Sequence, residues 1–270
     1  MTPPCILCYH KVDRRVELGV TRLSPRRFAR QMERLAGTGY TTLTLAELRA
    51  CLTGGRRPAR TEIAITFDDG YRALRDHAFP VLAAHGFTAA CFVVTAYAGK
   101  LNRWDVAYGG RRFAHLAWRD MRRWQGRGIE FASHTATHPR LTWLPDDAVS
   151  RELAQSRGDL RAALDIDAYA LSWPFGAHAQ REHAIARREG YGLAFTIGAA
   201  RSWTGDLFAV PRHPVYMWSP PKPGVGHLAR ADALAGTIAN RCAVGTSIIR
   251  RPRGADSVRR RPREAAPAGE

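Results

Sequence analysis

The run Thr-Phe-Asp-Asp-Gly at residues 66–70 places two carboxylates, Asp68 and Asp69, directly after an apolar, β-like segment. Adjacent carboxylates repel each other, and a continuous strand would send them to opposite faces of a sheet. The pattern is chemically reasonable if the strand ends there and a cation lies in front of it. One aspartate then binds a metal ion, while its unligated neighbour acts as a base. The alternative is a turn and helix N-cap before Tyr71.

A second run, Ser-His-Thr-Ala-Thr-His-Pro at residues 133–139, supplies two imidazoles, and His134 follows Asp69 by 65 positions (134 minus 69). A spacing of four would place His134 and His138 on one face of a helix. However, Pro139 disfavours helical geometry in the residue before it, so we expect a loop after a strand at residues 129–132. Two imidazoles and a carboxylate are the protein ligands of an open, catalytic metal site. A His-x3-His pair alone is equally consistent with a hydrogen-bonded loop.

These two motifs resemble the first two signature motifs of the NodB-homology polysaccharide deacetylases, carbohydrate esterase family 4. The resemblance extends from about residue 6 to residue 216. The runs Cys-Tyr-His-Lys-Val at residues 8–12 and Trp-Pro-Phe-Gly at residues 173–176 are most similar to the branch that contains the poly-N-acetylglucosamine deacetylases. The resemblance implies a distorted (β/α)7 barrel. It also implies a metal-dependent hydrolase that removes N-acetyl groups from a polysaccharide, an oligosaccharide or a lipid-linked glycan precursor.

The chemistry of such a hydrolase divides the motif residues by task. We expect Asp69, His134 and His138 to hold a divalent metal ion, with Asp68 as the base that takes a proton from water. Zinc is the expected ion, although two histidines and an aspartate also suit cobalt, nickel or iron. The resemblance places an oxyanion-stabilising backbone N–H at Phe175.

A general acid must protonate the departing amine, and histidine suits this task near neutral pH. Many family members use a histidine in a late leucine-histidine motif that this sequence lacks. His10 ends the first predicted strand within a Tyr-His-x-Val pattern, and His213 lies near the end of the last one. We favour His10 as the acid and keep His213 as the alternative. The remaining histidines that fall on predicted helices or loops are interpreted as structural: His77, His85, His115, His183 and His227.

The third motif departs from the family pattern at Ser172, where many relatives have an arginine that tunes the catalytic aspartate. Arg212 is predicted to supply this cation from the last strand, with Asp206 as its own partner. The alternative for Arg212 is an ordinary surface ion pair, worth under about 1 kcal/mol. Trp173 either offers an apolar face to the substrate or packs in the core.

Strand-like and helix-like segments alternate along the chain, which predicts a mostly parallel sheet closed into a barrel of about seven units. Active sites in such barrels lie at the carboxyl ends of the strands. The candidate site groups all fall at predicted strand ends: His10, Asp68 and Asp69, His134 and His138, residues 174–176, and Arg212 and His213. We assign residues 1–246 to one deacetylase domain. Residues 247–270 are rich in Arg, Pro, Ala and Gly and are predicted to be disordered.

The chain carries a formal net charge of +17, and 38 of its 41 basic residues are arginines. Codon bias in a GC-rich genome is one explanation. The other is attraction to an anionic partner, such as a phosphorylated lipid-linked glycan, an acidic polysaccharide or a membrane face. Nucleic acid is not expected as a partner, because no helix-turn-helix, zinc-finger or RNA-recognition signature accompanies these arginines.

Five cysteines without a metal-binding arrangement fit a reducing compartment and core packing. The sequence has no apolar run long enough to cross a membrane and no signal peptide at its start. We therefore expect a cytoplasmic protein, whereas a start codon further upstream would predict export. Two alternatives to the N-deacetylase remain: a catalytically impaired glycan-binding barrel, and a deacylase acting on another amide or on an O-acetyl ester.

Overall fold

The computed structural model describes residues 3–15, 21–103, 112–198 and 203–217. The predicted disordered tail at residues 247–270 lies outside the described residues. Within the described ranges, none of the helices combines the length and the apolar character that crossing a bilayer requires.

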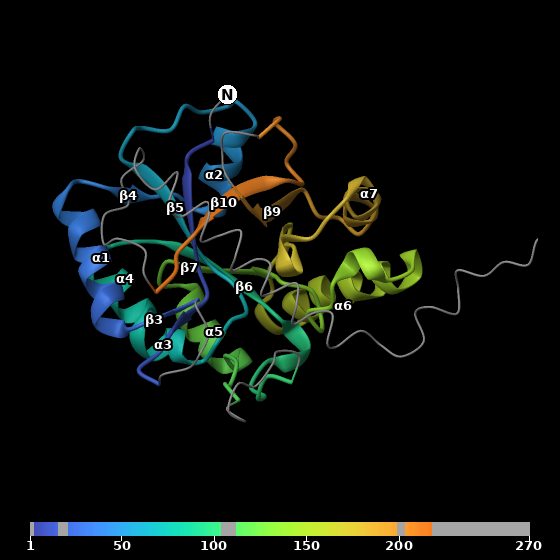
Figure 1. Ribbon diagram of the computed structural model, residues 1–270, viewed down its shortest axis with the longest axis horizontal. Coiled ribbons are helices and arrows are strands. Elements are labelled where there is room, and N and C mark those ends of the chain that lie inside the picture. Colours follow the sequence, from blue (N-terminus) through green and yellow to red (C-terminus); the bar gives the residue numbers. More distant parts are fainter. Residues whose placement is uncertain (1–2, 16–20, 104–111, 199–202, 218–270) are drawn as a thin grey trace, which may run out of the picture.

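Seven parallel strands form a closed ring in the order β1-β10-β9-β8-β7-β6-β5, and pairing of β1 with β5 closes it (Figure 1). The predicted distorted (β/α)7 barrel is therefore confirmed. The short strand β4 (Thr41–Thr42) extends the sheet beside β5, and β2 (Lys11–Val12) pairs separately with β3 (Arg22–Leu23). The barrel strands are β1 (Cys5–Tyr9), β5 (Glu62–Phe67), β6 (Ala89–Val93), β7 (Ile129–Ser133), β8 (Ala170–Ser172), β9 (Leu193–Ile197) and β10 (Val210–Pro214).

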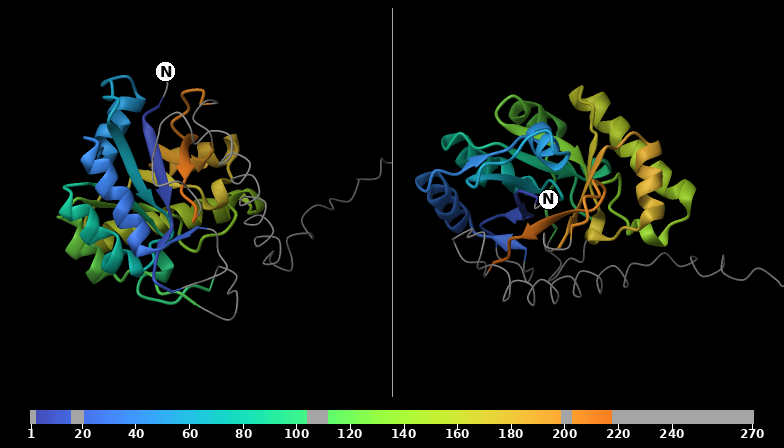
Figure 2. Two further views of the ribbon diagram at one scale, coloured as in Figure 1. Left: turned by 60° about the vertical axis from the view of Figure 1, so that its left-hand side comes forward. Right: turned by 90° about the horizontal axis from the view of Figure 1, so that it is seen from above.

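Helices surround the barrel on its outer side (Figure 2). Residues 73–84 form two short helices that meet at Ala78, because Pro80 lacks an N–H and its ring excludes the carbonyl four residues earlier. The α-helices are α1 (Pro25–Gly37), α2 (Leu45–Leu52), α3 (Ala73–His77), α4 (Phe79–Ala84), α5 (Trp118–Gln125), α6 (Asp146–Leu164) and α7 (Gln180–Arg188). Short 3₁₀ turns follow three of the strands or their loops: η1 (Thr95–Tyr97), η3 (Leu141–Trp143) and η4 (Pro174–Gly176).

Strand alternation divides the core into an inner and an outer part. One buried cluster, which includes Ile6, Ala64 and Phe92, fills the barrel interior. The neighbouring strand residues belong to a second cluster, in which Leu7 and Ile65 pack with residues of the outer helices. Successive residues of a strand therefore point alternately into the barrel and toward the helices. We call this alternation the parity of a residue, which is inward or outward.

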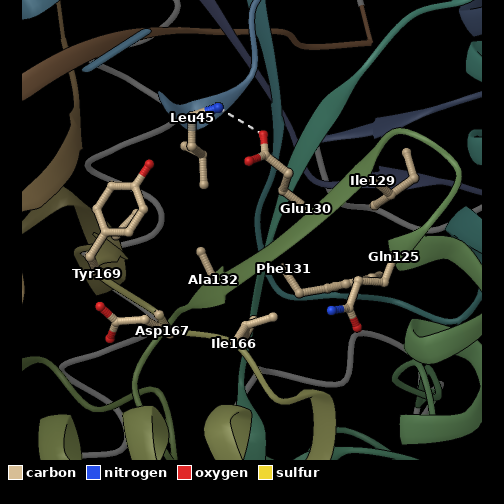
Figure 3. A pocket seen from close by; sticks show the side chains of 11 residues that line it. Leu45, Gln125, Ile129, Glu130, Phe131, Ala132, Ile166, Asp167 and Tyr169 are labelled. Atoms are coloured by element: carbon tan, nitrogen blue, oxygen red, sulfur yellow. Dashed lines mark hydrogen bonds between the residues drawn. The ribbon is translucent and has the colours of Figure 1, made fainter. Parts of the chain in front are cut away.

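Strands β7 and β8 pair through Ser133 and Leu171 near their carboxyl ends. Toward their amino ends they leave room for a cavity of about 240 Å³, in which the small side chains of Ala132 and Ala170 contribute to the lining (Figure 3). The carboxylate of Glu130 accepts a hydrogen bond of 2.7 Å from the backbone N–H of Leu45 at the start of α2. Burial raises the pKa of Glu130. This cavity lies at the end of the barrel opposite the predicted site residues.

Candidate active site

The predicted site residues gather at the carboxyl ends of the barrel strands, as expected for this architecture. Asp68 and Asp69 follow β5, and His134 and His138 follow β7 on a loop. The other predicted residues lie within or after the remaining strands: His10 after β1, Phe175 in the turn after β8, and Arg212 and His213 in β10.

Asp69, His134 and His138 form a buried cluster whose ligand atoms all lie within 4.8 Å of one another. One carboxylate oxygen of Asp69, Oδ1, is 3.5 Å from Nε2 of His134 and 3.7 Å from Nε2 of His138. Two ligands of a tetrahedral ion at about 2.1 Å are separated by roughly 3.4 Å. The observed separations therefore fit a single divalent cation.

The second ring nitrogen of His134 sets its tautomer. Nδ1 lies 2.7 Å from the backbone carbonyl of Ser172, and a carbonyl only accepts hydrogen bonds. In the neutral ring Nδ1 consequently carries the hydrogen, and Nε2 has a lone pair available for a cation held between it and Asp69, as in histidine ligands oriented by a second contact. Burial, followed by the electrostatic effect of His134, lowers the pKa of His138 to about 3, so this imidazole is neutral and able to bind a metal.

The loop between the two histidines is fixed by its own hydrogen bonds. The hydroxyl of Thr135 accepts from the backbone N–H of His138 at 3.0 Å, and the backbone N–H of His134 donates to the carbonyl of Val93 at 2.9 Å. Thr137 donates through both its backbone N–H and its hydroxyl to Glu152 of α6. These contacts fix the two imidazoles with respect to β6 and α6.

Left-handed backbone conformations are concentrated at this site. Five non-glycine residues of the described chain have positive φ, and four of them belong to the site: Asp69 (69°), Thr135 (64°), His138 (64°) and Phe175 (60°). Such conformations cost of order 1–3 kcal/mol each and persist where the surroundings enforce them. The fold thus maintains local strain where the predicted metal ligands lie.

Gly70 is predicted to be indispensable for this geometry. Its φ is +67°, and a Cβ atom there would lie 2.7 Å from Cγ1 of Val93. Gly70→Ala should lower the free energy of unfolding by about 2–4 kcal/mol, through left-handed strain and overpacking together. Gly39→Ala is the matched control, because Gly39 has a similar φ of +75° and open space around it. Urea unfolding measures both, and equal losses for the two variants would contradict the close-contact argument.

Asp68 is held by Arg212, which is completely buried. The guanidinium donates to both carboxylate oxygens, from Nη1 to Oδ1 at 2.8 Å and from Nη2 to Oδ2 at 2.7 Å. The hydroxyl of Ser172 accepts from Nη2 at 2.7 Å and donates to Oδ2 of Asp68 at 3.1 Å. Burial alone would raise the pKa of Asp68, but the guanidinium outweighs it, and the pKa lies well below its usual range. Asp68 is therefore ionised at neutral pH.

The predicted pairing of Arg212 with Asp206 is wrong. Asp206 lies before β10 on the outer side, where its carboxylate is 3.1 Å from Nδ1 of His183 and 3.7 Å from Nη2 of Arg187. Arg212 shares the inward parity of Val210 and turns to Asp68 inside the barrel instead. Proximity along the chain was a poor guide here, because Asp206 precedes β10 whereas Arg212 lies within this strand and points into the barrel.

The two candidate acids differ in the face they occupy. His213 is in register with Leu7, which packs with the outer helices, so alternation turns His213 to the outer side. His10 has the inward parity of Cys8, and one of its ring nitrogens lies within 4.8 Å of an Asp68 oxygen. Nδ1 of His10 is shielded from solvent and makes no hydrogen bond within the described part of the chain. Burial lowers the pKa of His10. The geometry therefore favours His10.

Cys8, His10 and Asp68 form a second group with metal-like spacing. A cation there would meet the Arg212 guanidinium, which already occupies both oxygens of Asp68. Burial also raises the pKa of the Cys8 thiol, so a metal would have to displace its proton. For these reasons the group of Asp69 and the two loop histidines is the better candidate for a cation site. Cys8 was predicted to be a core residue and is completely buried, but its thiol also contacts Oδ2 of Asp68 at 3.6 Å.

The two aromatic residues of the third motif have different surroundings. Trp173 is 1% exposed, and its Nε1 donates to the carbonyl of Phe208 at 2.8 Å, which confirms the core-packing alternative. Phe175 is only partly buried, and its ring centroid is 4.8 Å from that of His138. Phe175 therefore lies beside His138, at the edge of the candidate cation site. Trp173 packs in the core against residues of α7.

His115 is a site contact that the sequence did not suggest. It was interpreted as structural, because it lies in a connection without a recognisable motif. Its ring nitrogen Nδ1 lies 2.8 Å from the backbone carbonyl of Asp69. No pattern of spacing links these residues, which are 46 positions apart in the chain.

Comparison with known proteins supports a common origin. A family model described as polysaccharide deacetylase matches residues 55–194. YxkH of Bacillus subtilis, which is named as a polysaccharide deacetylase, is 29% identical over 209 residues, with 77% of this chain and 69% of YxkH covered. The poly-β-1,6-N-acetyl-D-glucosamine N-deacetylase of Escherichia coli K12 is 24% identical over 209 residues, and the match covers 66% of this chain and 31% of that enzyme.

Solved structures show the same fold. IcaB from Ammonifex degensii superposes with a TM-score of 0.70 at 22% identity, covering 92% of this chain and 98% of IcaB. The Streptococcus pyogenes deacetylase PplD, solved in complex with acetate, gives a TM-score of 0.69 at 24% identity, covering 81% of this chain and 94% of PplD. The family model spans more than half of the chain and includes both the carboxylate motif and the histidine loop. The protein therefore belongs to the polysaccharide deacetylase family.

Proposed function

We propose that this protein is a metal-dependent hydrolase that removes N-acetyl groups from an N-acetylated glycan. One observation carries the proposal. Three ligand atoms of Asp69, His134 and His138 lie within 4.8 Å of one another. Asp68, which immediately precedes Asp69 in the chain, carries an ionised carboxylate. A base beside a cation site is the arrangement that amide hydrolysis by water requires.

Each residue has a distinct task in this proposal. Asp69, His134 and His138 would hold a divalent cation, with zinc as the expected ion, which when bound would supply Lewis-acid polarisation of the acetamide carbonyl and a lower pKa of water. Asp68 accepts the proton of the attacking water, and Arg212 and Ser172 hold its carboxylate in place. The backbone N–H of Phe175 donates to the developing oxyanion. His10 gives a proton to the departing amine, so that acetate and a free amino sugar result.

The low pKa of Asp68 suits a base that holds its proton only briefly. A carboxylate stabilised by a guanidinium is a weak proton acceptor and passes the proton on readily. His10 is the nearby recipient, since one of its ring nitrogens lies within 4.8 Å of the carboxylate. Burial keeps His10 neutral at rest, so it becomes an acid only after it has received a proton.

The proposed substrate contains N-acetylglucosamine, because the Escherichia coli relative is named for that sugar polymer. An anionic or lipid-linked glycan precursor is the finer proposal. The net charge of +17 supports it, as does the row of exposed arginines on α1, namely Arg26, Arg30 and Arg34. A positive surface raises the local concentration of anionic substrates.

Acetate release tests the proposal directly. Purified protein should release acetate from chitooligosaccharides, from β-1,6-linked N-acetylglucosamine oligomers or from an N-acetylglucosaminyl lipid phosphate. A chelator should abolish the signal, and added Zn²⁺ should restore it. An O-acetylated sugar ester serves as the comparison substrate. Tight sugar binding without acetate under any divalent metal would instead identify a glycan-binding barrel that has lost turnover.

The assignment of the acid predicts a contrast between two histidines. His10→Gln should lower kcat by about 10²–10⁴-fold, the usual contribution of a general acid, because no group remains to protonate the amine. His213→Gln should stay within about twofold of the wild type, since this side chain faces the outer helices. Steady-state kinetics on the best substrate measures both. A large loss for His213→Gln with little loss for His10→Gln would reverse the assignment.

A further inference from the structure

The last part of the long β6–α5 connection, residues 114–116, lies directly against the turn after β5 that follows Asp69. The backbone N–H of Leu116 donates to the carbonyl of Gly70 at 2.8 Å, and that of Arg72 donates to the carbonyl of Ala114 at 2.7 Å. Tyr71 and His115 form an antiparallel bridge between these two bonds. The backbone after Asp69 is therefore paired with a segment more than 40 residues away, rather than only with its own neighbours.

His115 adds a side-chain contact to this pairing. The residue is 2% exposed, and its Nδ1 lies 2.8 Å from the backbone carbonyl of Asp69. Since a carbonyl only accepts, the hydrogen of the neutral ring is on Nδ1. This hydrogen bond holds the peptide group between Asp69 and Gly70. Asp69 has a φ of 69°, and Gly70 has a φ of 67°. Two successive left-handed residues are uncommon, because the first carries a side chain.

The His115 ring is itself fixed by aromatic contacts. It stacks on Tyr71 at a centroid distance of 5.1 Å and an interplanar angle of 24°, and Tyr97 lies 5.7 Å away. The buried ammonium of Lys11 lies 4.3 Å from the Tyr71 centroid and 3.7 Å from that of Phe113. A cation over the face of an aromatic ring is attracted to it. The imidazole thus has little freedom to leave the Asp69 carbonyl.

We infer that His115 is a positioning residue for the cation site, an inference that rests on the proposed metal-dependent function. By holding the Asp69 peptide in the left-handed conformation, it directs the Asp69 carboxylate toward His134 and His138. Contacts of this kind behind a metal ligand typically change metal affinity by 10–100-fold. The competing explanation is that His115 only packs between Tyr71 and Tyr97, in which case the affinity for a metal would not depend on its hydrogen bond.

Three substitutions separate the hydrogen bond from the packing. His115→Phe keeps an aromatic ring and removes the donor. His115→Asn places an amide N–H near the position of Nδ1 but removes the ring. His115→Gln carries its amide one bond further out, so its donor is misplaced. His85→Phe is the control, because His85 is exposed and lies outside the site.

The measurement is the Zn²⁺ dissociation constant of each folded variant, obtained by competition with a chromophoric chelator, together with the Tm of the metal-free protein. His115→Phe and His115→Gln should bind Zn²⁺ about 10–100-fold more weakly than the wild type. His115→Asn should bind it within about threefold of the wild type, and His85→Phe should bind it unchanged. If His115→Phe does not fold, the contrast between Asn and Gln gives the same test.

Unchanged Zn²⁺ affinity in His115→Phe and His115→Gln would overturn the inference, and a lower Tm of the metal-free protein alone would then identify packing as the only contribution. The test uses no glycan, so it is independent of the proposed reaction. A protein that binds Zn²⁺ with the expected pattern but releases no acetate would refute the proposed function and leave the assignment of His115 intact.

Discussion

Replacement of Asp68 by Asn is expected to lower kcat by about 10²–10⁴-fold, which is the range that positioned acid–base groups contribute. The amide cannot accept a proton from water, although it retains the size and shape of the carboxylate. The ligands Asp69, His134 and His138 are unchanged, so the Zn²⁺ affinity should remain close to that of the wild type. Single-turnover acetate release and a metal titration check the two parts of this expectation.

The same substitution should also destabilise the fold, which offers a sharper test. Arg212 is completely buried and makes its two shortest carboxylate contacts with Asp68. Removal of one partner of a buried ion pair typically costs 3–5 kcal/mol, because the other charge is left without compensation. Asp68→Asn should therefore unfold at a clearly lower urea concentration than the wild type.

A double variant distinguishes the two consequences. Adding Arg212→Met to Asp68→Asn removes the uncompensated guanidinium and replaces it with an apolar side chain between Phe92 and Phe195. Replacing both members of a buried pair with neutral groups is often close to neutral for stability. We expect the double variant to recover most of the stability and none of the activity. Recovery of activity would mean that Asp68 acts only through the pair and is not the base.

Replacement of His138 by Ala is the second change with a large expected effect. Structural zinc sites with four ligands bind with apparent energies of about 10–16 kcal/mol, which is roughly 3 kcal/mol per ligand. Loss of one ligand should weaken Zn²⁺ binding by about 10²-fold, since 1.4 kcal/mol corresponds to a factor of ten. Acetate release at limiting Zn²⁺ should fall accordingly and should recover in part when the metal concentration is raised.

His85→Ala is the matched control for this change, because it removes an exposed imidazole elsewhere on the barrel. The control should bind Zn²⁺ and release acetate as the wild type does. If His138→Ala bound Zn²⁺ with wild-type affinity, the ligand set assigned here would be incorrect, whatever the activity of the variant.

Much of the barrel is predictable from the sequence for a physical reason. Strands of a closed parallel barrel are covered on both faces, so they appear as short apolar runs such as residues 62–67 and 88–95. The loops between these strands carry the polar side chains, and the carboxyl ends of the strands all lie at one end of the barrel. The sequence alone therefore places Asp68, Asp69, His134 and His138 together.

Contacts between residues that are far apart in the chain and belong to no motif are harder to predict from the sequence. The choice between His10 and His213 depends on strand parity and register, which a boundary error of one residue would reverse. The partner of Arg212 depends on the barrel bringing β10 close to the end of β5, whereas the sequence suggested the neighbouring Asp206. His115 reaches the site from a loop without a recognisable motif. Cys8 belongs to the Cys-Tyr-His-Lys-Val run, but its apolar strand suggested only core packing and not a contact with Asp68.

The central claim is that Asp69, His134 and His138 share one divalent cation next to Asp68. A crystal structure of the Zn²⁺-loaded protein, with anomalous data collected at the zinc edge, tests it most directly. A single strong peak within about 2.3 Å of all three ligand atoms is the predicted result. A peak at Cys8 and His10 instead, or no peak near the two loop histidines, would contradict the claim.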